Sequence, residues 1–217
     1  MEDSRQVSRE EIIDIFIDYV EKEEKRPHHL KDIVKFSKLD FSEIKPFYDD
    51  VFEIEQSIYQ EIFEQTILTL ESDEAYHSYD ARLKLLSFYY TFFENINLNN
   101  DFFTVLLKDT KSKIATISSL GTFKKSFKNY LSQLHLEFID LKIPFANQVQ
   151  ENSLKEIVWT ELLLTLQFWA TDESENKEKT DIFIEKSVNT SFDLLDTSAL
   201  KSIFDLGKFV IGETFKK

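Results

Sequence analysis

Apolar residues recur along most of the chain at intervals of three and four, which is the spacing of one face of an α-helix. The pattern is clear near the N-terminus, where one stripe is formed by Ile12, Ile13, Phe16, Ile17 and Val20. Ser8 and Glu11 have the spacing of a capping box, in which two side chains satisfy free backbone N–H groups at a helix start. The sequence therefore predicts an all-α protein that opens with an amphipathic helix.

Interruptions of this pattern predict where the later helices lie. Pro27 separates the first helix from a second over His29–Ser37, and Asp40 caps a third that Pro46 shortens. Further helices are predicted over residues 52–70, 80–96, 101–108, 122–141, 153–171 and 180–195, and from 198 onward. The helix over 153–171 is expected to open with a capping box of Ser153 and Glu156, whereas 71–79 and 172–179 are polar connections and 111–120 give no clear pattern.

The composition excludes several classes of protein. The 217 residues contain only 3 glycines and 3 prolines, too few for a glycine-rich phosphate loop or for the many turns of a β-sandwich. Cysteine is absent, so there is no disulfide, zinc-thiolate site or thiol nucleophile. No pair of histidines has metal-binding spacing and no serine has the sequence context of a catalytic nucleophile, so we expect neither an enzyme nor a cofactor.

Charge and hydropathy indicate a cytoplasmic protein without membrane insertion. The N-terminus has no apolar targeting segment, and the densest apolar run, residues 159–170, is interrupted by polar residues and too short to span a bilayer. The net charge of −14 repels nucleic acid overall. Residues 25–48 nevertheless carry six basic and three acidic side chains, which is a local excess of basic charge.

The first three predicted helices, followed by a long one, have the layout of a helix-turn-helix unit with a linker helix. Their apolar and capping positions resemble the N-terminal domain of the TetR family of bacterial transcriptional regulators, in an ungapped register over about 45 residues. The positions that fit the family pattern are Ile12, Ile13, Ile17, Val20, Lys31, Asp32, Ile33, Val34, Ser37, Leu39, Asp40, Ile44, Tyr48 and Ile54. Glu24 and Lys38 stand where the family has turn glycines.

This resemblance implies two domains and a DNA-binding surface. Residues 1–51 would form the helix-turn-helix domain, and residues 52–217 would form the ligand-binding and dimerisation domain, starting with the linker helix. In such a unit the third helix enters the major groove of DNA. The implied DNA-binding residues are Lys31, Lys38, Phe41, Ser42, Glu43 and Lys45.

The resemblance also implies a small-molecule pocket and a dimer interface in the C-terminal region. The fifth to eighth helices would surround the pocket, with candidate lining residues Phe88, Phe92, Phe103, Phe127, Tyr130, Trp159 and Leu163. Aromatic residues at helical spacing are more often core than pocket, so both interpretations stay open. The last two long helices would pair with those of a second copy, through outward residues Leu162, Leu166, Trp169, Ile184, Val188 and Phe192.

Two functions remain open at this point. The first is a homodimeric regulator, taken as a repressor, whose partners are operator double-stranded DNA and a small hydrophobic effector. The alternative is a TetR-fold protein that binds a lipid or isoprenoid instead of DNA, which Pro46, Glu43 and the missing turn glycines favour. A purely structural interaction module is a third class, and nothing in the sequence favours it.

Overall fold

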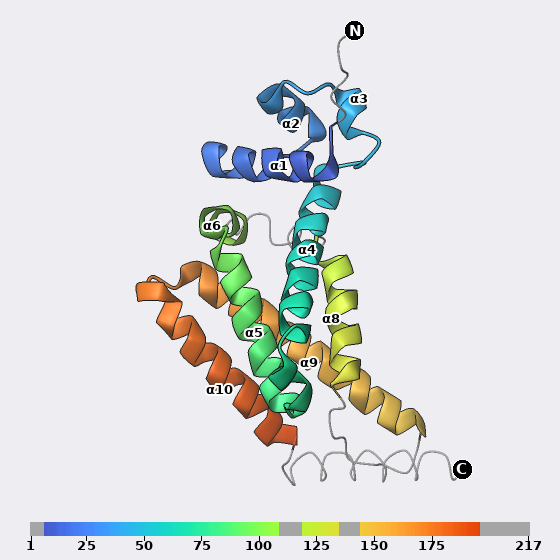
Figure 1. The fold of residues 1–217 in the computed structure, drawn as a ribbon, viewed down its shortest axis with the longest axis vertical. Coiled ribbons are helices and arrows are strands. Elements are labelled where there is room, and N and C mark those ends of the chain that lie inside the picture. Colours follow the sequence, from blue (N-terminus) through green and yellow to red (C-terminus); the bar gives the residue numbers. More distant parts are fainter. Residues whose placement is uncertain (1–6, 109–118, 135–143, 196–217) are drawn as a thin grey trace, which may run out of the picture.

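The computed structural model describes residues 7–108, 119–134 and 144–195, and no strand occurs among them. Figure 1 shows a small upper unit of three helices, which we call the head, above a larger group of helices, which we call the bundle. The predicted all-α class is confirmed. The predicted boundary between residues 51 and 52 falls in the first turn of the helix that enters the bundle, and the division into two domains stays a prediction.

The head consists of α1 (Arg9–Glu23), α2 (Leu30–Ser37) and α3 (Phe41–Ile44). Each helix starts where the sequence offers a cap: the backbone N–H of Glu11 donates to the Ser8 hydroxyl at 3.2 Å, for example. The backbone N–H groups of His29 and Asp40 donate to the carboxylates of Asp32 and Glu43, at 3.0 and 2.6 Å, which is one half of a capping box at each helix start. These caps fix the helix starts, and buried apolar residues of all three helices form the interior of the head.

The two turns of the head are left-handed although they contain no glycine. Glu24 ends α1 with a φ of 50°, and Lys38 ends α2 with a φ of 64°. Side chains disfavour this region of φ, so glycine is the usual residue in such turns. Pro46 has the predicted effect as well, because α3 ends at Ile44 after a single turn.

Helix α4 (Val51–Glu71) runs from under the head down the length of the bundle. Asp50 caps it by accepting from the backbone N–H groups of Phe52 and Glu53, at 2.8 and 3.0 Å. Its neighbours along the bundle are α5 (Ala81–Asn97) and α8 (Gly121–Gln133). Helix α4 is therefore the element that joins the head to the bundle.

The connection after α4 contains the short 3-10 helix η1 (Glu74–Ser78), and α6 (Asn100–Lys108) follows α5 under α1. The helix predicted over 122–141 is described as far as Gln133, and residues 135–141 lie outside the described part, as do residues 111–118. The helix predicted from Ser198 onward also lies outside the described residues.

One predicted helix start is wrong. Helix α9 runs without a break from Pro144 to Thr171, so Ser153 and Glu156 lie inside it and do not open it. Proline is tolerated in the first turn of a helix because the N–H that it lacks has no partner there. The Glu156 carboxylate instead pairs with Lys124 and Lys128 on α8. The 3-10 helix η3 (Glu175–Lys177) then leads into α10 (Glu178–Leu195).

Candidate functional site

The predicted DNA-binding residues divide into two groups in the structure. Lys31, Lys38, Phe41 and Ser42 are exposed on α2, on the turn after it and on the first turn of α3. Lys35 was not among the predicted residues, but it is exposed too. The spacings of four and three residues place Lys31, Lys35 and Lys38 on one side of α2, and we call them the lysine stripe.

Glu43 and Lys45 are engaged within the head. The Glu43 carboxylate accepts from the backbone N–H of Asp40 at 2.6 Å, as the second half of the capping box. The Lys45 ammonium pairs with the Asp49 carboxylate at 2.5 Å, and both side chains are largely exposed. Such an exposed pair contributes little to stability, but it partly neutralises a cation that the family resemblance assigns to DNA. The α3 side of the head, which carries Glu43 and Lys45, is thus less basic than its α2 side.

The predicted pocket residues form a packed aromatic cluster. Phe88 lies 5.0 Å from both Phe127 and Tyr130 between ring centroids. Phe92 and Phe103 are fully buried, Trp159 nearly so, and Leu163 is partly buried. Phe123, which the sequence did not single out, belongs to the same cluster: its ring stacks on Phe92 at 5.1 Å and meets Trp159 edge-on at 5.5 Å. Whether a ligand enters this cluster stays a prediction.

A small cavity lies at the lower end of the cluster. It has a volume of about 100 Å³, and Ile67, Leu70, Tyr76, Tyr130 and Leu134 are among its lining residues. The hydroxyls of Tyr76 and Tyr130 are 2.8 Å apart, and Tyr130 donates to the carbonyl of Lys84 at 3.1 Å. Burial raises the pKa of Tyr130, so its hydroxyl stays protonated. Of the predicted pocket residues, Tyr130 lines this cavity.

The predicted dimer residues do not face outward, which is a correction. Leu162, Leu166, Trp169, Ile184 and Val188 are at most 1% exposed, and Phe192 is partly buried. They face the protomer's own interior, because α9 packs against α6 and α8 while α10 packs against α5. The Trp169 indole N–H, for example, donates to the Asn97 side chain at 2.7 Å.

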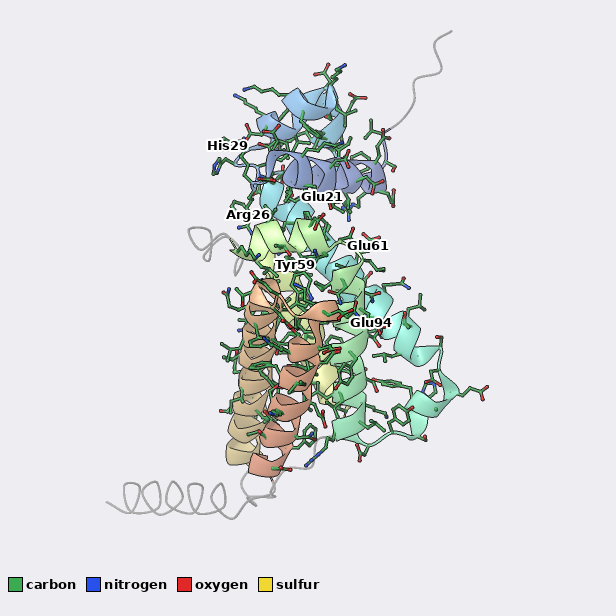
Figure 2. The ribbon with its side chains drawn as sticks, turned by 90° about the vertical axis from the view of Figure 1, so that its left-hand side faces the viewer. Glu21, Arg26, His29, Tyr59, Glu61 and Glu94 are labelled. Atoms are coloured by element: carbon green, nitrogen blue, oxygen red, sulfur yellow. The ribbon has the colours of Figure 1, made fainter. Side chains whose placement is uncertain are left out.

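The outer side of α9 and α10 carries a different set of apolar residues. Ile157, Leu164 and Ile182 are 49–57% exposed, and the rings of Phe168 and Phe183 stack at 4.8 Å. A groove of about 600 Å³ follows this side, and its lining is mostly apolar. Figure 2 shows α9 and α10 running side by side here. We call Ile157, Leu164, Ile182 and Phe183 the outer face.

Glu161 lies in the groove of the outer face and is only 8% exposed. Its Oε2 accepts from the Ser191 hydroxyl at 2.6 Å. Burial raises the pKa of this carboxyl, while the hydroxyls of Ser191 and Ser187 lower it. Glu161 is thus a buried acid in a groove that also contains the apolar side chains of Ile157, Leu164 and Phe183.

Sequence comparison decides the family. A family model described as "Tetracyclin repressor-like, C-terminal domain" matches residues 84–210, more than half of the chain. The chain belongs to the TetR family. The matched segment begins in α5 and includes α6, α8, α9 and α10, so it contains most of the bundle.

The TetR family assignment makes the chain a member of a family of regulators. None of the curated proteins matches it. In the part of the chain that the structure describes, no helix has both the length and the apolar character needed to cross a membrane. The head precedes the matched segment, so its relation to the TetR helix-turn-helix rests on the ungapped sequence pattern and on the three helices observed here.

Proposed function

We propose that this TetR-family regulator binds operator DNA as a homodimer through its head. The observation that carries the proposal is the lysine stripe, Lys31, Lys35 and Lys38, exposed along α2 and the turn into α3. In a helix-turn-helix the helix before the reading helix crosses the DNA backbone, where ammonium groups neutralise phosphates and release counterions. The proposal assigns this role to the stripe.

Base contacts are confined to a short segment in this proposal. Helix α3 has four residues, and its exposed side chains at the start are Phe41 and Ser42. Phe41 is 41% exposed and offers an apolar surface to a thymine methyl group, while Ser42 offers a hydroxyl to a base edge. Glu43 stays in its cap. We therefore expect phosphate contacts to supply most of the affinity and a few base contacts to supply the sequence preference.

The homodimer is proposed to form through the outer face. Large apolar side chains on both α9 and α10, beside a groove, suit a two-fold interface in which each copy presents the same surface. Two heads held this way would read two half-sites of a palindromic operator. The effector is proposed to be small and hydrophobic, entering at the cavity beside Tyr76 and Tyr130 and displacing rings of the aromatic cluster.

The DNA proposal is tested by replacing lysines of the stripe. Lys31→Ala and Lys38→Ala should each weaken binding of an operator selected from random duplexes, because each removes a phosphate contact from both heads. Fluorescence anisotropy across a salt series should show that the negative slope of log affinity against log salt becomes shallower by about 2 for each variant. Lys125→Ala, an exposed lysine on α8, is the matched control and should leave the slope unchanged.

A second candidate function is lipid or isoprenoid binding without DNA. It is favoured by the acidic segment from α3 to the start of α4, where Asp40, Glu43, Asp49, Asp50 and Glu53 outnumber Lys45, and by the aromatic core. Mass spectrometry of organic extracts from the purified protein tests it. A stoichiometric lipid, with no duplex enriched from the random pool, would favour this function over the regulator.

A further inference from the structure

A buried ion pair joins the head to the bundle. Arg26 follows α1 in the head, Glu55 lies in the second turn of α4, and the guanidinium Nη2 is 3.1 Å from the carboxylate Oε1. The two side chains are only 5% and 1% exposed. In every other ion pair of the described residues, at least one side chain is 40% exposed or more.

The same carboxylate oxygen also holds a third segment. The hydroxyl of Ser119, two residues before α8, donates to Glu55 Oε1 at 2.7 Å. One turn further along α4, the Tyr59 ring lies 5.5 Å from Phe103 on α6. Figure 2 shows the labelled Arg26 and Tyr59 one below the other where the head meets the bundle. Glu55 is thus a junction between the head, α4 and the segment that enters α8.

The burial of this pair argues for a role in orientation. Removing two charges from water is costly, and apolar residues of similar volume are often as stabilising as a buried ion pair. Burial raises the pKa of the Glu55 carboxyl even though Arg26 and the Ser119 hydroxyl act to lower it. A directional contact that is present despite this desolvation cost suits an interface at which the head must keep one orientation on the bundle.

Apolar packing also joins the head to the bundle. Helix α1 packs on α4 and α6, with the rings of Phe16 and Phe102 edge-on at 6.1 Å. Apolar packing is non-directional, so helices held by it alone can shift relative to each other at little cost. The hydrogen-bonded pair is directional, so it restricts the head to one angle.

We propose that Glu55 is the positioning residue of the head. By holding Arg26 and Ser119 on one oxygen, it fixes the angle of the head on the bundle and ties that angle to the segment entering α8. The proposal rests on the proposed operator binding for its consequence: with two bundles paired, this angle sets the distance between the two heads and hence the half-site spacing that the dimer accepts.

The first test measures the angle without DNA. The chain has no cysteine, so Glu21→Cys on α1 and Asn129→Cys on α8 give two specific spin-label sites, both exposed. Labelled chains are diluted with excess unlabelled protein, and pulsed electron paramagnetic resonance gives the distance distribution within one protomer. Arg26→Met combined with Glu55→Met removes both charges and keeps side-chain volume.

We expect one narrow distance distribution for the parent protein and a clearly broader one for the double variant. Glu161→Gln is the matched control, because it also changes a buried glutamate that accepts from a serine hydroxyl but lies away from the head; its distribution should stay narrow. Ser119→Ala should broaden the distribution less, and it decides the question if the double variant does not fold. An unchanged distribution in the folded variant would overturn the proposal.

The second test uses operators whose half-sites are moved apart in steps of one base pair. The parent protein should lose affinity by about tenfold when one base pair is inserted, because the half-sites move apart and rotate about the helix axis. The double variant should accept several spacings almost equally. A parent protein that binds no duplex would contradict the proposed function alone, since the distance measurement still decides the role of Glu55.

Discussion

At the scale of single residues, the turn between α9 and α10 depends on one carboxylate. Asp172 Oδ1 accepts from the Ser174 backbone N–H at 2.9 Å and from its hydroxyl at 2.6 Å. Its Oδ2 accepts from the Thr180 N–H at 2.9 Å and from the hydroxyl at 2.8 Å. Burial raises the pKa of Asp172, but these four hydrogen bonds outweigh burial and lower it to about 2. The carboxylate is therefore a charged cap for the first turn of α10.

Asp172→Asn should lower the free energy of unfolding at pH 7 by roughly 1–2 kcal/mol, the cost of losing a helix cap. Because the folded pKa lies below the ordinary value of 3.8, the parent protein gains this stability above pH about 4 and loses it as the pH falls toward about 2. The difference between parent and variant should therefore shrink between pH 5 and pH 2, as measured by urea unfolding at several pH values. Asp193→Asn, in an exposed pair with Arg82, is the control and should change stability little. Equal stability of the parent protein and Asp172→Asn at pH 7 would rule out the cap.

Phe123 is one of the rings that hold the aromatic cluster together. Phe123 is fully buried and makes ring contacts with Tyr59, Phe63, Phe92 and others. Phe123→Ala should lower the free energy of unfolding by about 3–5 kcal/mol, through lost burial and the cavity left behind. Phe52→Ala, at a ring that is 39% exposed, should cost far less in the same denaturant titration. A similar cost for both would mean that the ring cluster does not dominate the core.

At the scale of the helix, α9 has two apolar sides. The side formed by Leu154, Val158, Leu162 and Leu166 packs inside the protomer, and the side that includes Ile157 and Leu164 is exposed. The sequence identified both helices and their apolar character, but the residues that it expected to face outward are buried inside the protomer. The longer inward stripe, which also ends in Trp169, is the signal that favours the core for those positions. The outer face is the apolar surface that α9 and α10 leave exposed.

Leu164→Glu on the outer face tests the dimer. Leu164 is 57% exposed, so a charge there should leave the protomer folded but disrupt a homodimer that buries this side chain. Sedimentation velocity should show a shift from dimer to monomer, with an unchanged circular dichroism spectrum. Leu98→Glu, at an 81% exposed leucine after α5, is the matched control and should remain dimeric. A dimeric Leu164→Glu variant would place the interface elsewhere.

Local signals and long-range contacts differ in how far the sequence reveals them. Asp40, Asp50 and Pro46 act within a few residues, and the sequence placed the helices around them accurately. The start of α9 was missed because a proline such as Pro144 can either end a helix or occupy its first turn, and the pattern was interpreted as a helix end. The contact of Arg26, Glu55 and Ser119 joins positions far apart in the chain, so no local pattern indicates it. It depends on how the head docks on the bundle.

At the scale of the whole molecule, the chain is a TetR-family protein with a net charge of −14 and a basic stripe on its head. The lysine stripe is a local basic surface on an otherwise acidic molecule, so we expect DNA to approach the side of the head that carries it. In the proposed complex, the three lysines of the stripe would give six phosphate contacts per dimer. We therefore expect a slope of about −5 for log affinity against log salt.

The central claim is that the homodimer reads a palindromic operator with its two heads. The most direct measurement selects bound duplexes from a random pool and then measures the affinity of the enriched sequence by anisotropy across a salt series. The account predicts an enriched palindrome that binds two protomers, with the steep salt slope given above. Failure of the folded dimeric protein to enrich any sequence, even at low salt, would contradict it.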